Sequence, residues 1–321
     1  MGGPGVTSLV SLRDVSRHFP LPRRRLFTRP VLRAVQQVSF DVAPGEVVGL
    51  VGESGSGKST LGRVALGLLP ATEGAVLFEG QDLGALRPAQ MRAMRRHMQM
   101  VFQDPFASLN PRRSVGGAIA EVLALHGLPH GEADVGAALA RVGLEAADMK
   151  RRPRQFSGGQ RQRIAIARAL AVRPRFLVAD EPVSALDVSV QAGILKLLQE
   201  LRGELGLAML FISHDLTVVE AMADRVLVLY LGRVMEAGPA REIFRAPRHP
   251  YTAALLASAP GSKRPEMVLQ GEIPSPASPP SGCVFRTRCP FALPDCAREV
   301  PPLRSVAPGH EKACIRDDLA L

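Results

Sequence analysis

Residues 52–60, GESGSGKST, have the residue types and the spacing of a loop that binds phosphate. They fit the pattern G-x-x-x-x-G-K-[ST] and follow the apolar run EVVGLVG at 46–52. In such a loop glycines let backbone N–H groups approach a phosphate, the lysine reaches the β and γ phosphates, and the next hydroxyl binds Mg²⁺. The alternative to a phosphate-binding loop is a glycine-rich turn with a surface lysine. The apolar strand that precedes the loop makes this alternative less favoured. The predicted nucleotide-binding residues are Gly52, Ser54, Gly55, Gly57, Lys58, Ser59 and Thr60.

Two carboxylates, Asp180 and Glu181, follow a second apolar run in the segment RFLVADEP. This order puts both at the mouth of a central strand. Asp180 is suited to hold Mg²⁺ through water, and Glu181 is suited to polarise the water that attacks the γ phosphate. A strand that ends in Asp-Glu is weak evidence of catalysis by itself. Together with a phosphate loop, it predicts hydrolysis with Glu181 as the base.

The segment FSGGQRQRIAIARAL at 156–170 resembles the signature of ATP-binding cassette (ABC) ATPases. The resemblance implies that two nucleotide-binding domains dimerise head to tail, so that one signature grips the γ phosphate of ATP held by the partner. A serine that caps a helix, with free amides facing an anion, is chemically suited to this. A plain capped helix after a Gly-Gly turn is the alternative. The residues implied are Ser157, Gly158, Gly159 and Gln160.

Three further residues match this family in order along the chain, and a fourth stands upstream where the family generally has a tyrosine. Gln103 in VFQDP matches the glutamine that touches Mg²⁺ and senses the membrane partner, and Asp187 in SALD matches the aspartate that contacts the opposite subunit. His214 in FISHD matches the histidine that contacts the γ phosphate. For the aromatic ring that stacks on adenine, the resemblance suggests Phe19 in RHFP, with His18 as the alternative.

Short apolar runs recur along the chain and predict an α/β fold. The runs at 46–52, 176–180, 208–213 and 225–230 lack polar alternation, as is typical of strands buried on both faces. Helical patterns separate them, which predicts a parallel sheet covered on both sides. We therefore expect a P-loop NTPase core of the ABC type over 1–245, with a helical subdomain inserted at about 104–172.

After residue 245 the chain becomes rich in Pro, Ser and Gly, which predicts a small, irregular C-terminal module over 246–321. The segments HPYTAALLASAP, GEIPSPASPPSGCVFRTRCPFALPDC and GHEKAC resemble the C-terminal extension of ATPase subunits from oligopeptide and dipeptide ABC importers.

That resemblance implies an ATP-hydrolysing motor subunit of a bacterial importer, with peptides as the favoured cargo. It also implies three kinds of partner: a second ABC ATPase subunit in a heterodimer or homodimer, two transmembrane permease subunits, and an extracytoplasmic substrate-binding protein. Two alternatives remain, namely a motor for another cargo such as nickel, and a soluble ABC ATPase that acts on nucleic acid or ribosomes.

The four cysteines of the chain, Cys283, Cys289, Cys296 and Cys314, all lie in this module. Thiols stay reduced in the cytoplasm, so a metal is a better use for them than two disulfides. Zinc sites usually contain closer cysteine pairs than these, and a [4Fe–4S] cluster tolerates looser spacing. Some members of the importer family carry such a cluster in this extension. The alternatives are a [4Fe–4S] cluster, Zn²⁺, or free thiols.

Composition narrows the classes of partner. The 321 residues carry a net charge of +10, but Trp is absent and Tyr occurs twice, so aromatic platforms for nucleic-acid bases are scarce. We expect no nucleic-acid partner. No apolar run approaches the roughly 18 residues of a membrane span, and the start lacks the pattern of a secretory signal. With the importer resemblance, this predicts peripheral attachment at the cytoplasmic face of the inner (plasma) membrane.

Overall fold

A computed structural model describes residues 8–22, 30–104, 109–265, 267, 269–319 and 321. The chain forms two compact units, each assembled from separate stretches of sequence. The first unit contains Met1–Leu9, Val42–Glu46 and Ala85–Leu210, and the second contains Val10–Asp41, Val47–Gly84 and Phe211–Leu321. The whole C-terminal extension belongs to the second unit, and its boundary at 246 stays a prediction.

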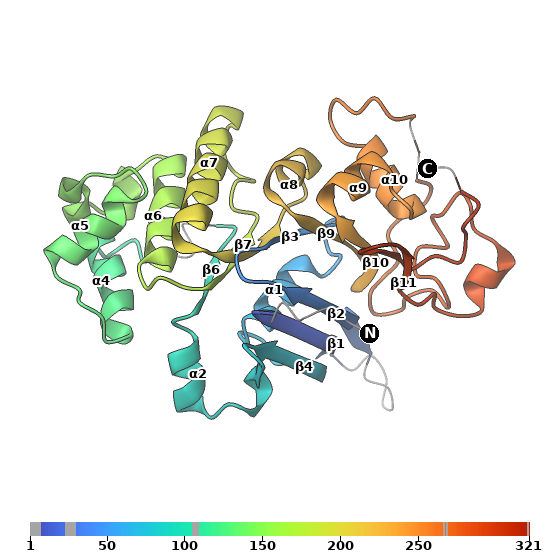
Figure 1. The fold of residues 1–321 in the computed structure, drawn as a ribbon, viewed down its shortest axis with the longest axis horizontal. Coiled ribbons are helices and arrows are strands. Elements are labelled where there is room, and N and C mark those ends of the chain that lie inside the picture. Colours follow the sequence, from blue (N-terminus) through green and yellow to red (C-terminus); the bar gives the residue numbers. More distant parts are fainter. Residues whose placement is uncertain (1–7, 23–29, 105–108, 266, 268, 320) are drawn as a thin grey trace. The chain divides into compact units, whose positions relative to one another are not determined.

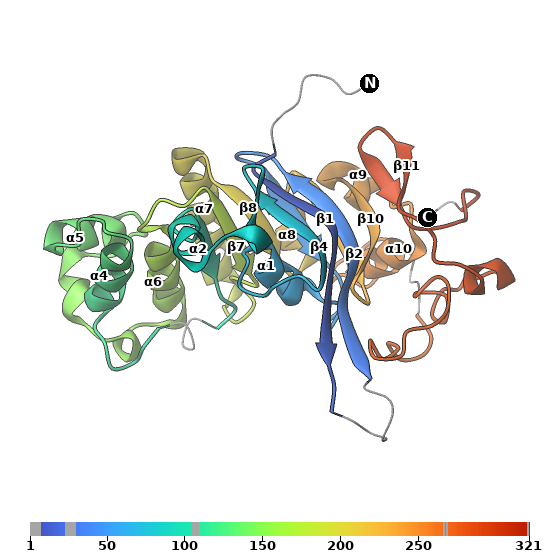
Figure 2. The ribbon, with the colours of Figure 1, turned by 90° about the horizontal axis from the view of Figure 1, so that it is seen from below.

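The second unit contains a curved antiparallel sheet with the strand order β2-β1-β4-β5 (Figure 2). Buried apolar side chains, among them Leu12 and Phe78, cover one face of this sheet. Strands β1 and β4 pair antiparallel, with Val10 opposite Phe78. The strands are β1 (Val10–Pro20), β2 (Val31–Val42), β4 (Glu73–Phe78) and β5 (Gln81–Asp82).

The second unit also carries the strands that lead into the phosphate loop. Strand β3 pairs parallel with β9, as the apolar runs predict, and all five residues of β3 are buried. Strand β9 then pairs antiparallel with β10, and β12 and β11 follow in antiparallel order. These strands are β3 (Val47–Val51), β9 (Arg225–Tyr230), β10 (Arg233–Pro239), β11 (Arg304–Ala307) and β12 (His310–Lys312).

The last two strands differ from the sequence prediction. The extension is not simply irregular, because its residues 304–312 continue the strand order beyond β10. The prediction of a parallel sheet holds for β3 and β9, whereas β10, β12 and β11 make the order mixed. Figure 1 shows the helices that accompany these strands: α1 (Lys58–Ala65), α8 (Leu216–Met222), α9 (Ala240–Arg245) and α10 (Pro250–Ala257).

The first unit contains two parallel strands, β6 (Met98–Val101) and β7 (Phe176–Asp180), and the helical subdomain between them. The described residues of 109–172 form helices and connecting turns with no strand, and residues 105–108 lie outside the described part. The bounds of the helical subdomain, about 104–172, stay a prediction. Figure 1 shows α4, α5 and α6 gathered in this subdomain. The helices of the unit are α2 (Pro88–Met94), α4 (Val115–Leu125), α5 (Glu132–Ala140), α6 (Gly158–Leu170), α7 (Val188–Leu205), and the short η2 (Ala146–Lys150) and η3 (Pro153–Gln155).

The remaining predicted strand is β8 (Ala208–Ile212), whose five residues are all buried. Its first three residues belong to the first unit and its last two to the second. Among the residues that the structure describes, no helix combines the length and the apolar character that a membrane crossing requires.

Candidate functional site

The phosphate loop lies between β3 and α1 in the second unit, as predicted. Gly52, Gly55 and Gly57 have φ values of +147°, +76° and +105°, which L side chains rarely adopt. A Cβ atom on Gly52 would lie 2.1 Å from the carbonyl oxygen of Leu229, and one on Gly57 would lie 2.1 Å from that of Ala34. The loop therefore depends on glycine for space as well as for backbone conformation.

Lys58 begins α1 and turns its side chain back over the loop. Its ammonium Nζ donates to the carbonyl oxygens of Gly52, at 2.7 Å, and Glu53, at 2.9 Å. The residue is only 6% exposed. An ammonium held by two loop carbonyl oxygens at the start of a helix is suited to meet phosphate oxygens.

Ser56 is a loop residue that the sequence analysis missed. Its Oγ atom is buried, and no hydrogen-bond partner for it exists in the described part of the protein. A buried hydroxyl without a partner costs free energy unless a ligand binds it. Together with the glycine cradle, this orphaned group fits a phosphate ligand, and Ser59 and Thr60 lie half-buried beside it at the start of α1.

Gln103 and Glu181 meet in the first unit. The amide Nε2 of Gln103 donates to Oε2 of Glu181 at 2.9 Å. Asp180 is the last residue of β7 and is buried, and Glu181 follows it with a φ of +47°. The structure thus joins two predicted catalytic side chains that are 78 residues apart in sequence.

The signature segment begins α6 in the first unit. The hydroxyl of Ser157 accepts from the Gln160 N–H at 3.3 Å, and Oε1 of Gln160 accepts from the Ser157 N–H at 3.0 Å. The Gln160 side chain therefore completes a capping box, which is a structural use that the sequence analysis did not assign. A Cβ atom on Gly159 would lie 2.4 Å from Val190 Cγ1, so this glycine is required for packing.

The surface around the signature is open. Ser157 and Gly158 are exposed, and so is Asp187, which takes the N-cap position of α7 without a side-chain cap bond. The next residue, Val188, is an apolar side chain with 82% of its surface exposed.

His214 and Phe19 belong to the second unit. His214 is exposed after β8, next to Asp215, whose Oδ1 accepts from the N–H groups of Thr217 and Val218 at the start of α8. Phe19 lies near the end of β1, where the guanidinium of Arg17 covers its ring at 4.6 Å. The role of Phe19 in adenine binding stays a prediction.

The four cysteines are all free thiols in the second unit. Burial, with a smaller contribution from neighbouring thiols, raises the pKa of Cys283 and of Cys289 to about 11. The sulfur of Cys296 accepts the Leu293 N–H at 3.4 Å, and that of Cys314 accepts the Arg316 N–H at 3.4 Å. Within the described residues, no group of three or more His, Cys, Asp or Glu side chains is arranged to hold a metal ion. The predicted iron–sulfur or zinc site is therefore not supported by this geometry.

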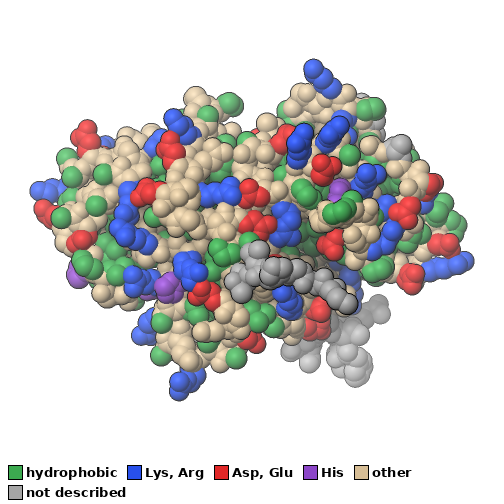
Figure 3. Space-filling model, in the orientation of Figure 1, with side chains coloured by type: hydrophobic (Ala, Val, Ile, Leu, Met, Phe, Trp, Pro, Cys, Tyr) green, Lys and Arg blue, Asp and Glu red, His purple; other side chains and the backbone are tan. Residues whose placement is uncertain are grey.

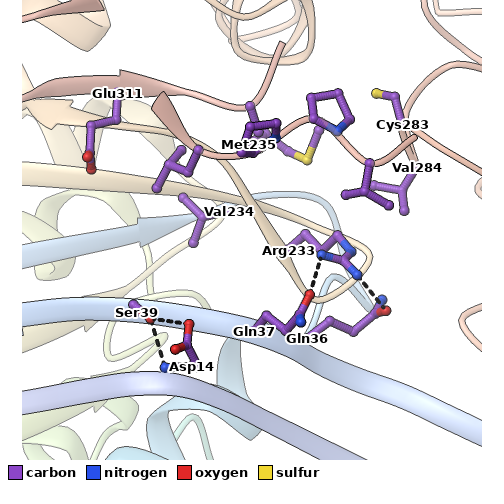
Figure 4. A pocket seen from close by; sticks show the side chains of 15 residues that line it. Asp14, Gln36, Gln37, Ser39, Arg233, Val234, Met235, Cys283, Val284 and Glu311 are labelled. Atoms are coloured by element: carbon purple, nitrogen blue, oxygen red, sulfur yellow. Dashed lines mark hydrogen bonds between the residues drawn. The ribbon is translucent and has the colours of Figure 1, made fainter. Parts of the chain in front are cut away.

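Cys283 also lines a cavity of about 560 Å³ in the second unit (Figure 4). On the side of β2 and β10, the guanidinium of Arg233 donates to Oε1 of Gln37 at 3.3 Å and to Oε1 of Gln36 at 3.4 Å. Val284 lines the cavity beside Cys283. A volume of this size admits small reagents to the thiol, although Cys283 has little exposure on the outer surface.

Comparison with known proteins places these features in a family. A family model described as ABC transporter matches residues 35–184, and one described as oligopeptide/dipeptide transporter, C-terminal region, matches residues 235–296. A putative peptide import ATP-binding protein of Brucella ovis is 52% identical, over 98% of this chain and 99% of its own length. The chain belongs to the family of ABC transporter ATPases.

Other similar proteins agree with this assignment. The oligopeptide transport ATP-binding protein AppF of Bacillus subtilis is 50% identical, over 96% of this chain and 97% of its own length. A solved dimeric bacterial ABC transporter cassette matches 72% of this chain and 99% of its own with a TM-score of 0.64 and 29% identity. A component of an ABC transporter complex from Clostridium perfringens matches 74% of this chain and 91% of its own, also with a TM-score of 0.64 and 29% identity.

Proposed function

We propose that the protein is the ATP-hydrolysing motor subunit of a bacterial ABC importer for peptides. The observation that carries this proposal is the combination of a phosphate loop built around Lys58 with an extension of the oligopeptide/dipeptide transporter type. The relatives from Brucella ovis and Bacillus subtilis are named for peptide import and oligopeptide transport, which supports the same cargo class.

Each predicted site residue has a role in this proposal. Lys58 binds the β and γ phosphates, and Glu181 accepts a proton from the attacking water while Gln103 orients its carboxylate. His214 contacts the γ phosphate and Phe19 stacks on adenine. The residues proposed to hold Mg²⁺ are Ser59, Asp180 and Gln103, and a bound Mg²⁺ would neutralise charge on the phosphates.

We also propose a head-to-tail ATPase dimer. In it Ser157, Gly158 and Gly159 bind the γ phosphate held by the partner, and Asp187 contacts the opposite subunit. The exposure of Ser157, Gly158 and Asp187 beside the bare Val188 side chain supports this use. The partner is a second, similar ATPase subunit in the favoured arrangement, with a homodimer as the alternative.

The other proposed partners are two transmembrane permease subunits and an extracytoplasmic substrate-binding protein. Attachment to the permeases would keep the protein at the cytoplasmic face of the inner membrane. The face shown in Figure 3 does not favour the nucleic-acid alternative, because Lys and Arg side chains are interspersed there with Asp and Glu. A single basic patch would be expected for binding to a phosphate backbone.

Uptake of labelled di- and oligopeptides tests the proposed cargo. A strain that lacks this protein should lose uptake, the intact gene should restore it, and a gene with Lys58→Ala should not. Unchanged peptide uptake together with lost nickel uptake would transfer the proposal to a nickel importer. ATP hydrolysis stimulated by RNA or DNA would favour the nucleic-acid alternative instead.

The metal content of the extension stays a prediction. Neighbouring thiols raise the pKa of Cys283 and of Cys289, which supports the proximity of the cysteines, but the described side chains form no metal-holding group. The three states to be distinguished are a [4Fe–4S] cluster, Zn²⁺ and free thiols. Anaerobic purification followed by iron, sulfide and zinc assays distinguishes them, and a colourless protein without either metal leaves free thiols.

A further inference from the structure

Glu53, the second residue of the phosphate loop, is held at all three of its polar groups. Its N–H donates to the Tyr251 hydroxyl at 2.9 Å, and its carbonyl oxygen accepts from Lys58 Nζ at 2.9 Å. Its carboxylate accepts two bonds from Arg288, with 2.6 Å between Nη1 and Oε2 and 3.0 Å between Nη2 and Oε1. Tyr251 and Arg288 both come from the C-terminal extension, about 200 residues or more along the chain.

The ion pair between Arg288 and Glu53 is largely withdrawn from water. The Arg288 side chain is 8% exposed and the Glu53 side chain 24%. Water and salt screen such a pair less than a surface pair, and two parallel bonds from one guanidinium fix the direction of the carboxylate as well as its position. The hydrogen bond to Glu53 raises the pKa of Arg288, so the guanidinium keeps its charge at every working pH.

An aromatic cluster supports both anchors of Glu53. Tyr251 is fully buried, with its ring centre 4.7 Å from that of Tyr230 and 5.2 Å from that of Phe285. The Arg288 guanidinium lies 5.9 Å from the Tyr230 ring centre. Phe285 and Arg288 belong to the segment between Cys283 and Cys289 in the C-terminal extension. The same aromatic cluster therefore packs against this cysteine-containing segment and supports the residues that hold Glu53.

We propose that Arg288 and Tyr251 are positioning residues for ATP binding, which act through Glu53 on the carbonyl oxygen that holds the Lys58 ammonium. This inference rests on the proposed role of residues 52–60 as the phosphate loop, and it gives the extension a direct part in setting the affinity for ATP. A displaced Glu53 carbonyl would displace the ammonium from the place where it meets the β and γ phosphates. Such a displacement weakens the charge-assisted contact between the ammonium and the phosphates and so lowers the affinity for ATP.

The direct experiment is a titration of the purified full-length chain with a fluorescent ATP analogue and Mg²⁺. Arg288→Gln and Glu53→Gln should each raise the Kd about tenfold, since each removes charge-assisted hydrogen bonds. Arg288→Lys should give an intermediate Kd, because lysine keeps the charge but not the planar fork. Tyr251→Phe removes only the hydroxyl, keeps the ring in the aromatic cluster, and should raise the Kd several-fold.

The double variant Arg288→Gln with Glu53→Gln should bind no more weakly than the worse single variant, because both changes remove the same interaction. Arg286→Gln is the matched control. Arg286 lies in the same segment and donates to the carbonyl oxygen and the hydroxyl of Ser281, so its replacement should leave the Kd unchanged. Additive losses in the double variant would contradict the proposed coupling.

Steady-state hydrolysis separates positioning from a merely structural role. Positioning weakens ground state and transition state alike, so KM should rise while kcat is kept. A structural role reduces the number of active molecules, so kcat would fall at unchanged KM. A lowered unfolding temperature would reveal that Arg288→Gln does not fold. In that case Arg288→Lys and Tyr251→Phe distinguish the two roles by the same comparison of KM with kcat.

Lys58→Ala keeps the two proposals apart. If this variant binds the analogue as the wild type does, residues 52–60 are not the phosphate loop and the proposed function fails first. If Lys58→Ala loses binding while Arg288→Gln and Tyr251→Phe keep the wild-type Kd, the phosphate loop stands and the positioning inference is overturned.

Discussion

Glu181 occupies a backbone conformation that is costly for a residue with a side chain. Its φ of +47° lies in the left-handed region, where a non-glycine residue pays on the order of 1–3 kcal/mol. Local bonds hold it there, since the N–H and the hydroxyl of Ser184 both donate to its carbonyl oxygen, at 3.3 Å and 3.1 Å. Gln103 fixes the carboxylate at the other end of the residue. Such backbone strain is typical of active-site residues whose side chains must point in one fixed direction.

Glu181→Gln should stop hydrolysis while ATP still binds. The amide has the shape of the carboxylate but cannot accept the proton of the attacking water, so the rate should fall about 100-fold to 10,000-fold. Phosphate release and analogue titration measure the two properties separately. Glu200→Gln is a matched control on the exposed face of α7, where Glu200 pairs with Lys196 at 3.8 Å. Steady hydrolysis in the Glu181 variant would refute its role as the base.

Gly57→Ala should unfold the loop locally and lower global stability. The new Cβ would meet the Ala34 carbonyl oxygen at 2.1 Å, and the left-handed φ adds a cost of about 1–2 kcal/mol for a residue with a side chain. We expect a lower midpoint in chemical unfolding and a large loss of ATP affinity. Gly203→Ala in α7 is the control, since its Cβ would meet nothing within 4 Å and alanine favours helix by about 1 kcal/mol. Equal unfolding midpoints for the two variants would contradict the steric argument.

At the scale of elements, buried Glu236 joins β10 to the start of α10 and to β12. Its carboxylate accepts the N–H groups of Arg248, at 2.6 Å, and His249, at 3.0 Å. The Nε2 atom of His310 in β12 lies 2.7 Å from the same carboxylate. A carboxylate with no exposed surface is stable only when such partners compensate its charge. This cluster therefore explains how the extension is attached to β10.

His249 makes this attachment sensitive to acid. Burial, with a smaller contribution from Lys312 and against the opposing effect of Glu236, lowers the pKa of His249 to about 4. The ring is thus neutral in the folded protein, and its Nδ1 accepts the Tyr251 N–H at 3.0 Å. Between about pH 6.5 and pH 4 the unfolded chain binds a proton that the folded chain does not, so stability should fall as the pH is lowered through this window.

The expected size of this effect is on the order of 3 kcal/mol, from about 1.4 kcal/mol per pKa unit. His249→Asn should flatten the pH dependence between pH 6.5 and pH 4, because asparagine keeps an N-cap acceptor for α10 and does not titrate. Denaturant unfolding at several pH values measures it. An unchanged pH profile in the variant would show that another group is responsible.

The sequence predicted the strands that are continuous apolar runs, and missed those that are not. Strands β3, β7, β8 and β9 are buried on both faces, so their continuous apolar sequence is enough to predict them as strands. Strand β6 is only four residues long and contains Gln99, and β12 is a polar segment that becomes a strand because the edge of β10 offers it hydrogen bonds. Such pairing depends on a distant partner and leaves no local pattern.

The same distinction applies to the candidate site. Residues 52–60 carry a local pattern, and the structure gives them the predicted loop. The bond between Gln103 and Glu181 could be expected only from the family resemblance. The contacts of Glu53 with Arg288 and Tyr251 had no sequence signal, because an arginine before a cysteine and a tyrosine in a short helix are ordinary until tertiary packing brings them to the loop.

At the scale of the whole molecule, ATP should assemble the chain with a partner cassette. Val188→Asp would place a charge on a side chain that is 82% exposed beside Asp187, where the proposed interface lies. In a Glu181→Gln background, which should keep ATP intact, this change should abolish the ATP-dependent dimer in size-exclusion chromatography with light scattering. Leu125→Asp, at another exposed apolar position, is the control and should leave the dimer intact. A dimer that survives Val188→Asp would place the interface elsewhere.

The pairing of β12 with β10 has a consequence for the chain while it is being made. The ribosome delivers Arg233–Pro239 well before His310–Lys312, and at roughly 5–20 residues per second the wait lasts several seconds. During this time one edge of β10 has unpaired N–H and C=O groups, which can form hydrogen bonds with a strand of another polypeptide. Chains that end before Arg304 should therefore aggregate more than the full-length chain, which sedimentation of the two after expression would measure.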